Sequence, residues 1–259
     1  MISQDFKLFD THLHIINNQF PLVPNNGYLP GEFTCEDYLN RMDGYRLVGG
    51  AIVSGSFQAL DQTYLVAALK KLGPRFVGVT QVSAAVTDEE LLELDRAGVR
   101  AVRFNLQRGG SEEVKHLDSL SRCIHALVGW HVELYVDSRE LASLYPVLVA
   151  LPAVSIDHLG LSSAGFATLL KLIENGVFVK ATGFGRLDFS VTAALKELFS
   201  ANPDALMFGT DLPSTRAPRP YEDNDFNLVI DVLGAAGASK VLFENATKLY
   251  RPAEIDDPI

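Results

Sequence analysis

Short apolar runs alternate with amphipathic stretches along most of the chain. The runs are rich in Val, Ile and Phe, which favour strands, and each has the length of a buried strand. The predicted strands are residues 7–13, 48–54, 76–82, 99–104, 132–136, 154–157, 177–182 and 205–209. Because apolar runs separated by helices are typical of parallel strands buried on both faces, the pattern predicts a parallel sheet.

The stretches between these runs carry helix start and stop signals. Thr87 and Glu90 form a capping box, in which the Thr hydroxyl bonds the Glu amide and the Glu carboxylate reaches back. Gly98 ends that helix. An apolar stripe at helical spacing predicts a helix over residues 223–236. The other predicted helices are residues 61–72, ending at Gly73-Pro74, residues 162–175, ending at Gly176, and residues 239–250.

Eight strand–helix repeats in 259 residues match the size of a (β/α)8 TIM barrel, which is an α/β fold. We therefore predict a single barrel domain over residues 1–259. The alternative is an open doubly wound sheet, which usually shows a glycine-rich turn after its first strand. Here a long loop with three prolines, residues 16–33, follows instead, and we expect it to cover the mouth of the barrel.

Composition argues against several classes of protein. The formal net charge is -10 and no basic stripe is visible, so nucleic-acid binding is not expected. The N-terminus lacks the features of a signal peptide, and the longest apolar stretch, residues 144–156, is shorter than the ~20 residues of a membrane helix. Two cysteines do not make a disulfide framework, so we expect a cytoplasmic protein with no membrane partner. A homo-oligomer is compatible with the sequence, which does not define the oligomeric state.

Two histidines stand two residues apart at the end of the first predicted strand. Residues i and i+2 of a strand point to the same face, so His12 and His14 are expected to project side by side. Imidazole is a common metal ligand and carries protons near neutral pH. A surface strand with two chance histidines would give the same spacing. Their place at a strand end favours function, because barrel active sites form where strands end.

Other polar side chains follow the later strands. His158 directly follows the sixth strand and Asp211 the eighth, and we expect both at the site. Arg103 lies between two apolar residues of the fourth strand, and a buried arginine needs an anionic partner. An exposed loop arginine would explain Arg108 equally well, and an ordinary core tyrosine would explain Tyr135. With Arg103, the candidates for substrate binding are Ser56, Arg108, Tyr135 and Arg186.

Three histidines, one aspartate and at least two arginines around one barrel mouth would form a site for a small anion. A carboxylate can act as a general base, and imidazoles can polarise a carbonyl group or hold a metal ion. Asp137 and Asp157 are instead expected to be structural, and His116, His125 and His131 to be structural or exposed.

Three motifs lie at strand ends: His12-x-His14, Asp157-His158-Leu159-Gly160 and Gly209-Thr210-Asp211-Leu212-Pro213. They resemble the amidohydrolase superfamily, and within it the amidohydrolase-2 group of TIM-barrel hydrolases. Residues 244–250 match the ending typical of that group, so the likeness extends over nearly the whole chain. Segments 98–105, 129–135 and 180–186 are most similar to the group's 2-pyrone-4,6-dicarboxylate lactonase.

The resemblance implies a hydrolase that opens a small anionic lactone, such as 2-pyrone-4,6-dicarboxylate, in aromatic catabolism. By resemblance, Asp211 is the general base that activates water, the three histidines polarise the lactone carbonyl, and arginines bind substrate carboxylates. Most metal-dependent members carry a histidine ligand on strand five, and the binuclear enzymes a bridging lysine on strand four. This chain has Tyr135 and Arg103 there. The resemblance therefore implies no cofactor and no bound metal.

One departure and two alternatives remain open. The lactonase carries a further arginine three residues after the strand-six histidine, where this chain has Leu161. A lactone with one carboxylate, or a sugar-acid lactone, is therefore also a candidate substrate. The alternative enzyme is a hydrolase or decarboxylase of a small carboxylate, with zinc or another divalent metal held by His12, His14, His158 and Asp211. A binding protein on a degenerate barrel is the third class; the presence of a base, polarising groups and anion anchors argues against it.

Overall fold

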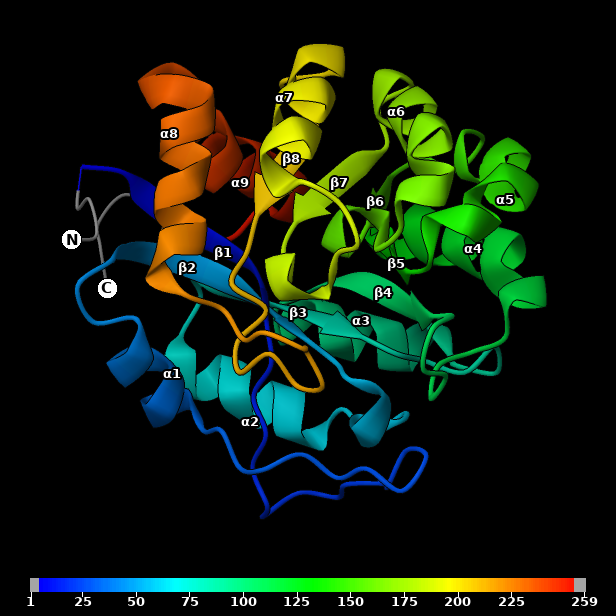
Figure 1. Ribbon diagram of the computed structural model, residues 1–259. Helices are drawn as coiled ribbons and strands as arrows, with labels where there is room; N and C mark the ends of the chain where they lie inside the picture. Colours follow the sequence, from blue (N-terminus) through cyan, green and yellow to red (C-terminus); the bar gives the residue numbers. More distant parts are fainter. Residues whose placement is uncertain (1–4, 254–259) are drawn as a thin grey trace.

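The computed structural model, in which residues 5–253 are described, places eight strands around a barrel (Figure 1). All neighbouring strands are parallel and follow chain order from β1 to β8. The strands are β1 Lys7–Leu13, β2 Arg46–Val53, β3 Phe76–Thr80, β4 Val99–Asn105, β5 His131–Tyr135, β6 Val154–Ile156, β7 Phe178–Ala181 and β8 Leu206–Phe208. Each overlaps a predicted strand, and the (β/α)8 prediction is confirmed.

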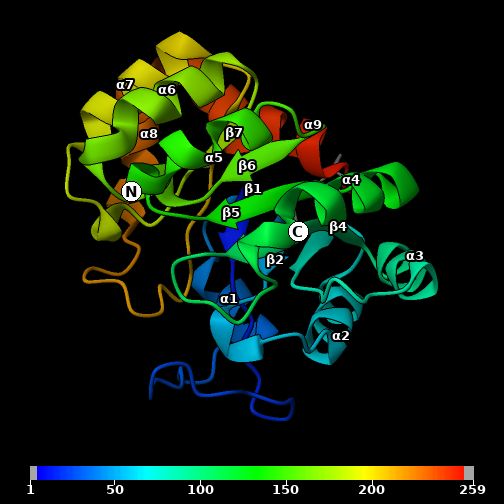
Figure 2. The same cartoon turned by 90° about the vertical axis from the view of Figure 1, so that its right-hand side faces the viewer.

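Helices surround the strands in both views (Figures 1 and 2). The α-helices are α1 Cys35–Arg41, α2 Thr63–Leu72, α3 Asp88–Arg96, α4 Leu117–Val128, α5 Leu141–Leu148, α6 Phe166–Glu174, α7 Val191–Ala201, α8 Asp223–Ser239 and α9 Asn245–Tyr250. Short 3-10 turns are η1 Ser56–Gln58, η2 Val114–His116, η3 Ser138–Glu140, η4 His158–Gly160, η5 Ser163–Gly165 and η6 Phe184–Arg186. The predicted capping box of Thr87 and Glu90 starts α3.

The ends of β1 and β8 meet where the barrel closes. The amide of Asp211 donates to the carbonyl of His12 over 2.7 Å. Below them, the buried carboxylate of Asp10 accepts hydrogen bonds from the amide of Thr210 at 2.8 Å and from its hydroxyl at 2.6 Å. These bonds hold the first and eighth strand ends, and therefore their histidine and aspartate side chains, in a fixed relation.

The C-terminal segment Asp223–Tyr250 runs through α8, a π-helical turn (η7, Lys240–Glu244) and α9. It is long and apolar enough to cross a membrane by length and composition alone. Gly234 breaks it with φ 67°, and it packs against α7, β8 and β1. The sequence predicted two helices, residues 223–236 and 239–250, with a break at residues 237–238. The break instead falls at Gly234, which adopts the left-handed conformation that glycine reaches without steric cost. A helix that covers a barrel meets the same criteria, so the segment supports no conclusion about a membrane.

The loop of residues 16–33 packs against loops that border the mouth, and its predicted role as a cover over the mouth stays a prediction. Ile16 and Phe33 exchange backbone hydrogen bonds of 2.8 Å, which close the loop at its base. Its middle contacts two other loops: the amide of Val23 donates to the carbonyl of Phe57, and the Asn25 side chain donates to the carbonyl of Arg108. The long loop therefore joins the loops that follow β2 and β4.

Candidate active site

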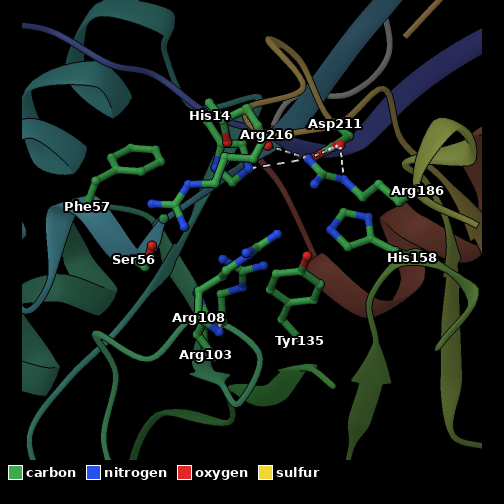
Figure 3. Close-up of a pocket in the computed structure, with 13 residues that line it drawn as sticks. His14, Ser56, Phe57, Arg103, Arg108, Tyr135, His158, Arg186, Asp211 and Arg216 are labelled. Carbon is green, nitrogen blue, oxygen red and sulfur yellow. Dashed lines mark hydrogen bonds and ion pairs between the residues drawn. The ribbon is translucent and has the colours of Figure 1, made fainter. Parts of the chain in front are cut away.

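Three imidazoles gather around the carboxylate of Asp211 at the carboxyl ends of β1, β6 and β8. Figure 3 shows two of them, His14 and His158, beside Asp211. The Nε2 atoms of His12 and His14 lie 3.9 Å and 3.7 Å from Asp211 Oδ1. The ring centroids of His12 and His158 are 4.8 Å apart. All four side chains are nearly inaccessible to solvent. The structure thus brings together the four residues that the sequence assigns to catalysis.

Each imidazole is oriented by a contact of its Nδ1 atom, which leaves Nε2 available to the site. The partners are the Asp157 carboxylate for His12 at 3.4 Å, the Val53 carbonyl for His14 at 2.7 Å and the Thr182 hydroxyl for His158 at 2.8 Å. Such outer contacts fix both the ring orientation and the tautomer of an active-site histidine.

These contacts give the histidines different hydrogen-bonding roles. His14 Nδ1 faces a carbonyl oxygen and must donate, so a neutral His14 presents a lone pair at Nε2. The Thr182 hydroxyl accepts from the backbone amide of His158 and can donate to its Nδ1. A neutral His158 can therefore present an Nε2–H donor. Burial lowers the pKa of His12 to about 4 and holds the pKa of His158 well below its usual range, so both are neutral near pH 7.

The Asp211 carboxylate is paired on one side only. Arg186 donates to its Oδ2 atom from Nε at 2.7 Å and also bonds the Thr215 carbonyl. Burial alone would raise the pKa of Asp211, but the guanidinium of Arg186 and the nearby His158 hold the pKa below its usual range. Asp211 is therefore ionised near neutral pH, with Oδ1 facing the histidines.

The backbone is strained at two of these residues. His158 has φ 51° and Asp211 has φ 61°, in the left-handed region that non-glycine residues rarely adopt. Such strain costs about 1–3 kcal/mol per residue and is concentrated at functional sites. Gly183 lies against this region, since a Cβ atom there would come 2.7 Å from His158 Nδ1. A glycine at this position gives the imidazole the space it needs.

Four arginines line the pocket; two of them form an ion pair with an aspartate and two do not. Arg103 bonds the Asp157 carboxylate at 2.8 Å, as Arg186 bonds Asp211, so each has an anionic protein partner. Asp157 lies beneath the pocket, where it pairs with Arg103 of β4 and contacts His12, and its predicted structural role stays a prediction. Arg108 and Arg216 have no ion pair with a carboxylate among residues 5–253. The pocket also includes Ser56 and Tyr135, so every residue predicted to bind substrate lies at this mouth.

Arg216 was missed in the sequence, and Lys180 was noted there only as a polar residue at the end of the seventh predicted strand. Arg216 lies five positions after Asp211 in the loop that follows β8, and the strand-end pattern gives no signal for it. Lys180 on β7 is wholly buried beneath the site, 2.5 Å from Glu133 and 3.5 Å from Asp157. A lysine inside an apolar strand, next to a strand with a buried glutamate, is the available signal for this pair.

The residues present fit a divalent cation. Ligand atoms of His12, His158 and Asp211 lie within 4.8 Å of one another, and His14 adjoins them. Neither His12 Nε2 nor Asp211 Oδ1 has a hydrogen-bond partner among the residues described, although both atoms are buried. Nitrogen donors combined with a carboxylate suit zinc. The donor set is therefore compatible with the metal-dependent alternative, and the expectation of a metal-free site stays a prediction.

The fold and the site together define a barrel hydrolase with a histidine–aspartate centre at the carboxyl ends of its strands. The family model described as amidohydrolase matches residues 9–251, and the chain belongs to this family. The chain is therefore a hydrolase, and the resemblance to the amidohydrolases that was inferred from the sequence motifs is confirmed.

Two curated relatives are lactone hydrolases. A 2-pyrone-4,6-dicarboxylate hydrolase of Comamonas testosteroni is 27% identical over 95% of this chain and 90% of its own. A 4-sulfomuconolactone hydrolase of Rhizobium radiobacter is 27% identical over 93% of this chain and 89% of its own. An apo crystal structure from Agrobacterium tumefaciens superimposes with a TM-score of 0.86 at 22% identity, covering 98% of both chains, which supports the fold.

Proposed function

We propose that this chain hydrolyses the ring ester of a small lactone that carries anionic groups. The observation that carries the proposal is the ionised Asp211 carboxylate, which pairs with Arg186 only through Oδ2 and lies in a pocket with four arginines. The two lactone hydrolase relatives support the same reaction class, and the names of both describe anionic substrates. A lactone such as 2-pyrone-4,6-dicarboxylate fits this description.

In the proposed reaction, water adds to the lactone carbonyl carbon while Asp211 accepts one of its protons. The ring C–O bond then breaks, and the leaving oxygen takes that proton. Because Arg186 lowers its pKa, Asp211 is a weak base, and positioning in a desolvated site must offset this weakness. The Nε2–H tautomer of His158 can donate to the developing oxyanion, as oxyanion stabilisation requires.

A metal-dependent form is the second candidate, favoured by the lone pair of His14 and by the unpartnered atoms of His12 and Asp211. A divalent cation held by His12, His14, His158 and Asp211 would polarise the carbonyl and lower the pKa of bound water. Without a bound cation, neutral His12 and His14 can stabilise an oxyanion only if their Nε2 atoms carry the proton, because only a protonated nitrogen can donate a hydrogen bond.

A lactone panel assayed by proton release, with and without chelator, tests both forms. The panel includes 2-pyrone-4,6-dicarboxylate, 4-sulfomuconolactone and a sugar-acid lactone. We expect turnover of at least one anionic member. Metal analysis of protein purified without chelator then separates the forms, because a stoichiometric metal required for turnover contradicts the metal-free mechanism. Binding without turnover of any member would instead favour a binding protein.

A further inference from the structure

Lys180 of β7 carries a buried charge that the proposed reaction does not use. Its side chain is wholly inaccessible to solvent, and its Nζ atom lies 2.5 Å from the Glu133 carboxylate and 3.5 Å from Oδ1 of Asp157. A buried ammonium group is tolerated only with anionic partners, and these two carboxylates supply them. One further contact leads to the site, because Nζ also lies 3.5 Å from Nδ1 of His12. Lys180 thus connects the ion pairs below the site to an imidazole within it.

Two charged groups compete for Nδ1 of His12. The Lys180 ammonium can only donate, so it requires a lone pair on Nδ1, whereas the Asp157 carboxylate, with Oδ1 3.4 Å away, requires a proton there. Only the lysine contact has the geometry of a hydrogen bond, although a long one, since Oδ1 of Asp157 has no hydrogen-bond partner among the residues described. The other oxygen of Asp157 accepts from Arg103 at 2.8 Å. The contacts at Nδ1 therefore favour a lone pair on that atom.

The opposite side of the ring favours the same tautomer. Nε2 of His12 faces Oδ1 of Asp211 across 3.9 Å, and both atoms are buried and unpartnered among the described residues. A lone pair on Nε2 would set two acceptors against each other in a site without protein donors between them, whereas a proton there directs a donor toward the carboxylate. His14 already presents a lone pair to the same oxygen at 3.7 Å, because its Nδ1 must donate to the Val53 carbonyl. His12 is therefore the better placed of the two to carry a proton at Nε2.

We propose that Lys180 is a positioning residue that holds neutral His12 in the tautomer with its proton at Nε2. The inference rests on the proposed function and gives the two histidines of β1 different roles: His12 donates to the developing oxyanion, and His14 presents an acceptor. A metal ion requires the lone pair of a ring nitrogen, so a proton at Nε2 of His12 removes one ligand from the metal-dependent form. Lys180 therefore favours the metal-free form of the reaction from below the site.

Nitrogen NMR of protein labelled at its histidines measures the tautomer directly and needs no substrate. Correlations between the ring nitrogens and the ring C–H protons distinguish a protonated nitrogen from one with a lone pair, and His12→Gln assigns the His12 signals by removing them. In wild-type protein freed of metal by a chelator, we expect the proton at Nε2 of His12 and the lone pair at Nδ1. The reverse tautomer would overturn the proposal, whatever the protein hydrolyses.

Two variants separate the contact with His12 from the stability of the buried ion pair. Lys180→Met removes the donor to Nδ1, whereas Glu133→Gln breaks the same ion pair and keeps the lysine beside His12. We expect Lys180→Met to move the His12 proton to Nδ1 and to lower kcat by about 10- to 100-fold with little change in KM. Glu133→Gln should keep the wild-type tautomer. The same tautomer in both variants, or an equal loss of kcat, would indicate a purely structural role for Lys180 and overturn the proposal.

Two further points keep the test decisive. If Lys180→Met does not fold, the double variant with Glu133→Gln replaces it, because it removes the unpaired carboxylate together with the lysine; its His12 proton should again lie at Nδ1, and a proton retained at Nε2 would contradict the proposal. A chain with the predicted tautomers in the wild type and the variants that hydrolyses no lactone would contradict the proposed function and leave the role of Lys180 supported.

Discussion

The barrel contains two layers of charge that differ in how they are neutralised. Beneath the site, Glu133, Lys180, Asp157 and Arg103 form a buried chain in which each charge faces an opposite one. His131 and Tyr250 complete it by hydrogen bonding to Glu133. At the mouth, only a few ångströms away, His12 Nε2 and Asp211 Oδ1 are unpartnered among the residues described, and two arginines lack carboxylates.

The difference indicates that the lower layer supports the structure and the upper layer binds and converts a ligand. A charge far from water is tolerated only when it is paired, and each charged group of the lower layer has an oppositely charged partner, although the Oδ1 atom of Asp157 has no hydrogen-bond partner among the residues described. The same layer orients the upper one, since Asp157 contacts both Arg103 and His12. Unpaired groups at the mouth contribute nothing to folding by themselves. They are explained by a ligand that completes them, and substitutions in the two layers should therefore have opposite signatures.

The largest expected effect is on catalysis in the upper layer. Asp211→Asn keeps the shape of the side chain but cannot accept a proton, so kcat should fall by roughly two to four orders of magnitude. Substrate affinity should change little. A variant that loses binding but keeps its rate would refute the assignment of Asp211 as the base. Metal content, measured on the same preparation, would also fall if the site holds a cation.

Breaking the lower layer should unfold the protein instead. Lys180→Met leaves Glu133 as an uncompensated buried charge, and the free energy of unfolding should drop by about 3–5 kcal/mol. Urea denaturation measures this loss. The double variant Lys180→Met with Glu133→Gln should recover part of it, because the unpaired charge is gone. Arg108→Met serves as the matched control, and a similar loss there would erase the contrast between the layers.

An intermediate effect is expected where the layers meet. Thr182→Val keeps the size of the side chain but removes the hydroxyl that contacts His158 Nδ1, so kcat should fall by roughly 10- to 100-fold. KM should change less, and the pH profile should shift because the tautomer of His158 is no longer fixed. Thr192→Val, on α7 outside the barrel, is the control. Equal effects on kcat and stability, with an unchanged pH profile, would indicate a purely structural role for Thr182.

The smallest expected effect is a change in the pH dependence of stability. Burial opposes ionisation of Glu133, but the Lys180 charge outweighs it and lowers the pKa of Glu133 from 4.5 to about 2. The unfolded chain therefore takes up a proton below pH 4.5 that the folded chain refuses. Stability from this group is present above pH 4.5 and is lost as the pH falls toward 2. In urea titrations, Glu133→Gln should flatten this slope; an unchanged slope would show that the pair does not control it.

Much of the fold could be predicted because strand length, apolar pattern and helix caps are local. The location of the site could also be predicted. His12 and His14 end one strand, and His158 and Asp211 follow two others; because a barrel brings all strand ends to one rim, these residues were expected to lie together. The break in the C-terminal helical segment was predicted a few residues beyond Gly234. Several small residues follow Gly234, and the sequence pattern does not show at which of them the helix is interrupted.

The sequence by itself determined the barrel, the family motifs and the placement of Asp211 and three histidines at strand ends, because each depends on local spacing and on strand order. Tertiary structure alone decided which arginines are free. Arg216 and Arg219 lie three positions apart in one loop, yet Arg219 pairs with Asp225 while Arg216 reaches the pocket and bonds Asn25. Partners distant in the chain, such as Arg103 with Asp157 and Lys180 with Glu133, likewise appear only when the strands close. An ion pair depends on distance in space, which a single sequence does not contain.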